Sequence, residues 1–244
     1  ASLLSALASL FRILSYFQKK ARIYRLGTFR FSGTLFVKGM LNGSSEFIGE
    51  MSTGIAMFAY NFVIMRKIGA DGVTAFTIAG YAAYGFNMLV VGFGQGASPL
   101  ISFAYGAKEY ELAGKLRQRT NRYVFFAGAA VFLAMTVNSG WYGSLFVQNE
   151  NIAEMIRSGM VIFTSAFFFA GINGITSFYF TATGRALESA VISLSRGLVV
   201  LLACIFVLPA LLGMTGVWMA APVTEAVTLM LTVFFLYRDR KRSR

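Results

Sequence analysis

The stretch RALESAVISLSRGLVVLLACIFVLPALLG, residues 185–213, decides the fold class of this chain. Between Ser189 and Gly213, its only charged residue is Arg196. A helix needs about 20 predominantly apolar residues to cross the hydrocarbon core of a bilayer. The stretch therefore predicts a membrane-spanning helix.

Similar apolar runs fill most of the remaining sequence. Of the 244 residues, 57% are apolar and 13% are charged, whereas soluble domains average about 45–50% and about 25%. We therefore expect an all-α polytopic membrane helix bundle of six transmembrane helices. The expected spans are 38–66, 70–105, 122–140, 152–183, 185–213 and 216–237. The expected domains are the tail of a preceding transmembrane helix (1–17), a basic cytoplasmic loop (18–37), a six-helix lobe (38–237) and a basic cytoplasmic tail (238–244).

The composition also excludes several kinds of chemistry. The chain has no histidine and a single cysteine, Cys204, so it cannot form a histidine-based catalytic triad, an intrachain disulfide or a cysteine-rich metal site. A membrane enzyme would need a clustered nucleophile and base, or a set of metal ligands. The sequence offers neither, so we expect no enzymatic activity and no cofactor.

The positive charges indicate the orientation in the membrane. The net charge is +12, but the basic residues lie in short loops between apolar runs, which disfavours a nucleic-acid partner. One side of the predicted bundle carries 17 basic residues and the other side carries 3. Because basic loops stay in the cytoplasm, both ends of the six-helix unit are expected there, with the lipid bilayer as the surrounding partner.

Two acidic residues, Glu46 and Glu50, lie in the first expected span. An ionisable group inside a bilayer costs at least about 2.5 kcal/mol, so such groups usually face a cavity or a partner. Thr53, Tyr60 and Asn61 fall on the same helical face. This face could exchange a proton or bind a cation, which makes Glu46 and Glu50 candidate cation ligands. If Glu46 instead lies at the cytoplasmic interface, it is simply solvated.

A polar stripe also follows the second expected span. It contains Tyr84, Asn87, Gln95, Ser98 and Ser102, which lie within about 80° of one another on a helix. The stripe suits either a cavity lining or close helix packing. Pro99 is expected to kink or break this helix.

Polar groups appear in the later spans as well. Asn173, Ser177 and Phe180 share a face of the fourth span, and an aromatic face with a few polar groups suits flat organic cations. Arg196 lies mid-span and needs a partner. The candidate partners are Glu188, Glu225 and Glu50, and Glu225 could instead line the cavity.

Three segments together resemble the second half of multidrug and toxic compound extrusion (MATE) transporters. NGSSEFIGEMSTGIAMFAYNFVIMRKIGADGVTAF (42–76) resembles the seventh helix of that family, and GQGASPLISFAYGAKEYELAGKL (94–116) resembles a helix-end motif. Residues 179–225 resemble the signature of the tenth to twelfth helices. In this sequence the signature comprises the Thr183-Gly184 turn, Arg196, Pro209, Gly213, Gly216-Val217-Trp218, Pro222 and Glu225.

The resemblance implies a function that the residues alone do not. MATE transporters have two six-helix lobes and exchange amphipathic organic cations for H⁺ or Na⁺. This chain would be the C-terminal lobe, in a bacterial inner membrane, and would need the N-terminal six-helix lobe or a second copy as its partner. Sodium-coupled members have an acidic residue in the tenth helix, where this chain has Asn173. The alternatives are a related flippase for lipid or polysaccharide precursors, or a non-transporting half-size membrane protein.

Overall fold

The computed structural model describes residues 2–18 and 31–242. Within these ranges the regular structure is helical, without strands. The chain divides into two units, Ala1–Lys38 and Gly39–Arg244. The bundle that carries most of the expected site residues lies in the second unit.

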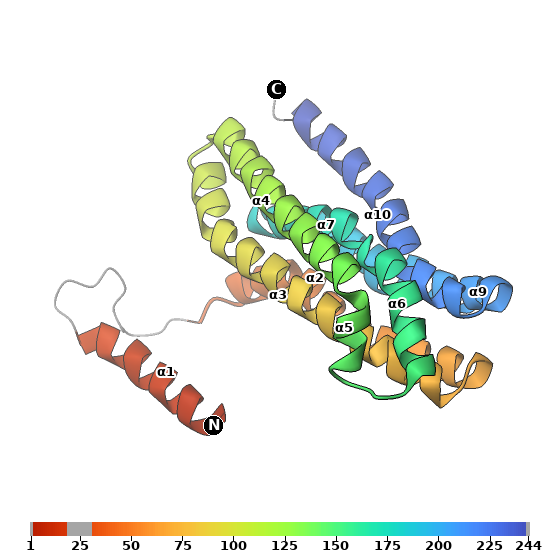
Figure 1. Ribbon diagram of the computed structural model, residues 1–244. Helices are drawn as coiled ribbons and strands as arrows, with labels where there is room; N and C mark the ends of the chain where they lie inside the picture. Colours follow the sequence, from red (N-terminus) through yellow and green to blue (C-terminus); the bar gives the residue numbers. More distant parts are fainter. Residues whose placement is uncertain (1, 19–30, 243–244) are drawn as a thin grey trace. The chain divides into compact units, whose positions relative to one another are not determined.

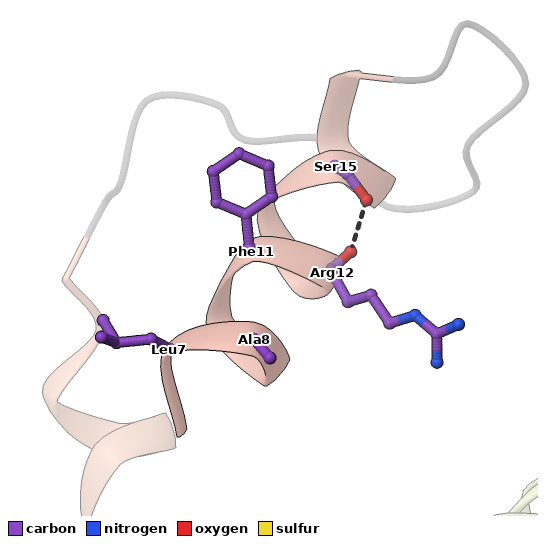
Figure 2. A pocket seen from close by; sticks show the side chains of 5 residues that line it. All are labelled: Leu7, Ala8, Phe11, Arg12 and Ser15. Atoms are coloured by element: carbon purple, nitrogen blue, oxygen red, sulfur yellow. Dashed lines mark hydrogen bonds between the residues drawn. The ribbon is translucent and has the colours of Figure 1, made fainter. Parts of the chain in front are cut away.

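The first unit contains helix α1 (Ser2–Gln18) and the first residues of α2 (Gly33–Lys67). Figure 2 shows a shallow hollow on α1, lined by Leu7, Ala8, Phe11, Arg12 and Ser15. The Ser15 hydroxyl donates a hydrogen bond to the Arg12 carbonyl at 2.8 Å. Because one helix supplies all five lining residues, the hollow is a feature of its surface and does not enclose a ligand.

The second unit packs the remaining helices into a bundle, in which α3, α4 and α7 run side by side (Figure 1). After α2, the helices are α3 (Ala70–Gly106), α4 (Tyr110–Val137), α5 (Ser139–Ser144), α6 (Glu150–Thr164), α7 (Phe167–Ala182), α8 (Ala186–Leu194), α9 (Val200–Leu212) and α10 (Met214–Arg242). A single π-helical turn, η1 (Ser195–Val199), joins α8 to α9.

The six expected spans correspond to these helices. Within the described residues, five helical segments are long and apolar enough to cross a membrane, and the bent pair α6–α7 raises the number to six. The segment α8–η1–α9 counts as one of the five. The all-α membrane bundle expected from the sequence is therefore confirmed.

Several helix boundaries differ from the expected spans, because those spans were based on apolar runs alone. Helix α4 begins at Tyr110 instead of residue 122, because its charged first turns are built from good helix formers such as Leu, Lys, Arg and Gln. Helix α2 begins at Gly33, inside the expected loop, and α10 continues to Arg242, inside the expected tail. The short helix α5 was not expected.

Pro99 does not break α3, which continues through this residue to Gly106, and a kink at Pro99 stays a prediction. The chain also bends by 47° between α6 and α7, at Ser165–Ala166, where no proline occurs. The fourth span is thus two helices with different directions.

The largest apolar core joins the second half of α2 to α3, α6, α9 and α10. Phe76 lies at its centre, with its ring centroid 4.3 Å from that of Tyr60 and 6.0 Å from that of Trp218. Trp218 also packs directly on Gly159, where a Cβ atom would lie 2.0 Å from the indole ring. This core fixes α2 against the helices that carry the buried polar groups.

Candidate functional site

A buried ion pair between Arg196 and Glu225 lies inside the bundle. Arg196 belongs to the π-helical turn η1, and Glu225 belongs to α10. The Arg196 Nε and Nη2 atoms both donate to Glu225 Oε1, at 3.1 and 2.7 Å. The side chains are only 25% and 11% exposed. Of the three partners considered for Arg196, the structure selects Glu225.

Asn173 of α7 connects this ion pair to a second point on α10. Its amide nitrogen donates to Glu225 Oε2 at 2.8 Å and to the Glu225 carbonyl at 2.9 Å. Its amide oxygen accepts a hydrogen bond from the Thr232 hydroxyl at 2.8 Å. Asn173 and Thr232 are fully buried. Buried polar groups need such partners, so Asn173 acts here as a cross-link between α7 and α10.

A cluster of hydroxyl groups joins α7 to α8 nearby. The Ser177 hydroxyl shares hydrogen bonds with those of Ser189 and Ser193, at 2.8 and 3.2 Å. The Ser189 hydroxyl also shares one with Thr181 at 2.8 Å. Ser177 therefore lies inside the packed lobe, bonded to other side chains.

A second ionic cluster lies where α7, α8 and α10 meet. Arg185 forms ion pairs with Glu188, at 2.6 Å, and with Asp239 of α10. Asp239 also accepts a hydrogen bond from the Tyr179 hydroxyl at 2.8 Å. The Arg117 guanidinium of α4 lies 5.5 Å from the centre of the Tyr179 ring. This cluster ties four helices together at one end of the bundle.

Phe180 is part of the same packed region. It is fully buried, and the Arg185 guanidinium lies 4.9 Å from the centre of its ring. The Phe235 ring makes an edge contact with it at 6.3 Å. In this conformation, Phe180 stacks on a cation of the protein itself and is shielded from an external ligand.

The expected site residues of α2 take different positions. Glu50 and Thr53 are exposed, and Asn61 is half-buried. Tyr60 is buried against Phe76, and its hydroxyl has no hydrogen-bond partner within the described residues. The side chain of Glu46 lies outside the described part of the structure.

The expected stripe of α3 lies largely on the surface. Tyr84 is 65% exposed, and Asn87 and Gln95 are exposed as well. Ser102 donates to the carbonyl of Ala182 at 2.8 Å, so the end of the stripe contacts α7. The expected site thus separates into a buried network around Asn173, Arg196 and Glu225, and an exposed set on α2 and α3.

The acids of these two ionic clusters are neutralised by arginines of the same chain. Glu188 and Asp239 are paired with Arg185, and Glu225 is paired with Arg196. Most of these partners are far apart in sequence, so their pairing was not visible there. Any preference of this lobe for cations must come from acids that are not neutralised in this way.

The ionic cluster at Asp239 was not among the expected site residues. Asp239 is the single acid in the basic segment RDRKRSR (238–244), and this isolation was the one signal that could have identified it. Among the described residues, no group of three or more Asp, Glu, Cys or His side chains could hold a metal ion.

Comparisons with known proteins identify the family of this chain. The sequence model of the MatE family matches residues 46–207. The "Multidrug export protein MepA" of Staphylococcus haemolyticus (strain JCSC1435) is 23% identical over 254 residues, which cover 98% of this chain and 52% of that protein. The chain thus spans about half the length of the curated relative that it matches.

Solved structures show the same fold. One, titled as an outward-facing conformation of a multidrug resistance MATE family transporter of the MOP superfamily, has a TM-score of 0.87 at 22% identity. It covers 98% of this chain and 53% of that one. Another, a MOP superfamily transporter from Pyrococcus furiosus, has a TM-score of 0.83 at 22% identity and covers 98% and 54%.

These relatives are named as transporters and not as enzymes. The family match extends from the first acid of α2 through most of α9, and the fold match includes nearly the whole chain. The helices are long and apolar enough to cross a bilayer. The chain is therefore an integral membrane protein that belongs to the MatE family of transporters.

Proposed function

We propose that this chain forms one six-helix lobe of an antiporter that exports amphipathic organic cations in exchange for H⁺ or Na⁺. The proposal combines family membership with the coverage of about half of each relative. The second lobe would be the N-terminal six-helix lobe of the transporter or a second copy of this chain. Transport would follow from a rocking motion of the two lobes around a central cavity.

The observation that carries the proposal is the exposed polar stripe on α3. Tyr84, Asn87 and Gln95 are exposed on a helix that is otherwise apolar enough to span a membrane. Polar side chains that face lipid are unfavourable, and they usually face a cavity or another helix. Since these three side chains face neither the core of this lobe nor its ionic clusters, they line the side that the second lobe would cover.

The acids of α2 supply the coupling charge in this proposal. Glu50 is exposed on α2, and Glu46 is one turn away in sequence. A carboxylate that gains a proton or a sodium ion changes the local charge, and this change favours one conformation of the lobe over another. The buried Glu225 cannot serve as freely, because Arg196 already neutralises it.

The orientation follows from the loop charges. The basic end of the bundle would face the cytoplasm of a bacterial cell, with both ends of the six-helix unit on that side. The bacterial inner membrane is the expected location. Substrates would then enter from the cytoplasmic side and leave on the side of Arg66 and Lys67.

Ligand binding tests the proposal and distinguishes it from a flippase. Purified protein with both lobes should bind ethidium, and the double variant Asn87→Leu/Gln95→Leu should bind it much more weakly. Phe93→Leu is the matched control, since Phe93 is exposed on the opposite face of α3. Binding of an anionic pyrophosphate lipid in place of ethidium, or equal ethidium binding by all variants, would contradict the proposal.

A further inference from the structure

The first half of α4 carries a row of cations on its outer face. The segment KLRQRTNRYVFF spans residues 115–126. Lys115, Arg119 and Arg122 are separated by four and three residues, so they lie above one another on one side of the helix. All three are exposed. Phe126, 63% exposed, continues the same row one turn further on.

The fourth basic residue of this segment points the other way. Arg117 is partly buried and lies over the Tyr179 ring, with 5.5 Å from its guanidinium carbon to the ring centre. Burial in the bundle lets Arg117 contribute to packing with α7. The structure thus distinguishes one cation used for packing from three that face outward.

The outward cations have little competition from acids of this chain. Lys115 pairs with Glu111 at 2.7 Å, but the side chains are 61% and 84% exposed. Such exposed pairs are weak, because water screens both charges. Within the described residues, Arg119 and Arg122 form no salt bridge. An external anion would therefore meet guanidinium groups that are available for binding.

The length of α4 indicates where these groups lie relative to a membrane. A helix of 28 residues is about 42 Å long, whereas the hydrocarbon core is about 30 Å thick. The charged turns must project beyond the core, and the exposed Tyr123, Phe126 and Leu133 lie deeper. The charged residues of α4 end at Arg122, so the headgroup region of the bilayer is expected around Arg119 and Arg122.

The neighbouring end of α10 has the same sign of charge. Arg238 and Arg240 are exposed there, and Asp239 between them bonds to Tyr179, the residue that Arg117 covers. The beginning of α4 and the end of α10 are therefore close together. Basic residues near a membrane surface attract anionic lipid.

We propose that Lys115, Arg119 and Arg122 form a binding surface for the phosphate groups of anionic phospholipids, with the acyl chains lying against Phe126 and Leu133. The cations match the charge of the headgroup, and the apolar continuation of the row matches the chains. A soluble acidic partner would match only the cations. The proposal is independent of the transported substrate.

The test compares the protein in phosphatidylcholine nanodiscs with and without phosphatidylglycerol. Wild-type protein should retain phosphatidylglycerol in native mass spectra and should unfold at a higher temperature when this lipid is present. Arg119→Gln/Arg122→Gln should lose most of both effects, whereas Arg119→Lys/Arg122→Lys should keep most of them. Unfolding temperatures in pure phosphatidylcholine show that each variant is folded.

The matched control is Arg66→Gln/Lys67→Gln, which removes two exposed cations from the far end of α2. It should retain the full effect of phosphatidylglycerol. Equal lipid retention by the Arg119→Gln/Arg122→Gln variant and the wild type would overturn the proposal. The same stabilisation by inorganic phosphate in phosphatidylcholine nanodiscs would also overturn it, because the site would then bind the anion without the lipid.

Discussion

Among single residues, Arg196 and Glu225 show what could be predicted from the sequence and what could not. A lone arginine in a membrane span required an acidic partner, and sequence reduced the choice to three. The selected partner is 29 residues away, across the turn at Gly213, whose φ is +58°. Sequence could not supply the direction of the chain after that turn, so it could not choose among them.

Asn173 illustrates the opposite case. A polar residue in mid-span suited a cavity, and the same property suits a helix cross-link. The structure places Asn173 between Glu225 and Thr232. This position depends on how α7 and α10 are rotated relative to each other, which the sequence does not specify. Tyr84, Asn87 and Gln95, in contrast, are exposed, and their role as a cavity lining or as a packing surface stays a prediction.

The ion pair leads to a prediction about stability. Glu225→Gln leaves the partly buried Arg196 without a counter-charge and should lower the free energy of unfolding by about 3 kcal/mol. Chemical unfolding in detergent measures this loss. Glu111→Gln, which removes one partner of an exposed pair, should leave the free energy of unfolding nearly unchanged. Equal stability of Glu225→Gln and the wild type would contradict the prediction.

A second prediction concerns removal of the whole pair. Glu225→Leu/Arg196→Met removes both charges, and replacing a buried pair by apolar side chains is often neutral. The double variant should therefore be more stable than Glu225→Gln in the same unfolding assay. If it is less stable, then Arg196 and Glu225 contribute more through their other contacts than through compensation of charge.

At the scale of elements, apolarity predicted the helices well and their ends poorly. The runs at 70–105 and 216–237 correspond to α3 and α10. The charged start of α4 and the bend between α6 and α7 escaped prediction. The search for apolar runs passed over the charged helix formers at the start of α4, and no proline or glycine marks residues 165–166.

The close approach of α9 and α10 leads to a prediction about helix packing. A Cβ atom at Gly216 of α10 would lie 2.1 Å from the backbone oxygen of Leu208 in α9. Because backbone atoms cannot move aside like a flexible side chain, Gly216→Ala should destabilise the protein by about 1–3 kcal/mol. Gly92→Ala in α3 meets no atom within 4 Å and should cost nothing. Thermal unfolding distinguishes the two, and equal stability would contradict the packing of α9 on α10.

For the whole molecule, the proposed orientation rests on the charges of the loops, and the proposed half-transporter rests on the length of the chain. The basic end of the bundle contains Lys115, Arg185 and Arg238, and the other end contains Arg66 and Lys67. The chain matches about half of each relative, and the proposed function assigns the other half to a partner. Sequence predicted the membrane bundle and the family, but it could not distinguish buried from exposed polar groups.

The proposed orientation predicts the accessibility of cysteines. Because Cys204 is the single native cysteine, Cys204→Ala provides a cysteine-free background. In it, Lys67→Cys should react with a membrane-impermeant maleimide in intact cells, and Lys115→Cys should react only after permeabilisation. Both positions are exposed, so the protein itself shields neither cysteine from the maleimide. The reverse pattern would contradict a cytoplasmic location of the basic end.

Ethidium efflux from cells that produce this lobe together with its complementary lobe tests the proposed transport function most directly. Wild-type protein should export ethidium, and Glu46→Gln/Glu50→Gln at the same expression level should not. Glu109→Gln/Glu111→Gln, which removes two acids at the start of α4, should export at the wild-type rate. Wild-type efflux by the Glu46→Gln/Glu50→Gln variant would contradict the role of α2 in coupling.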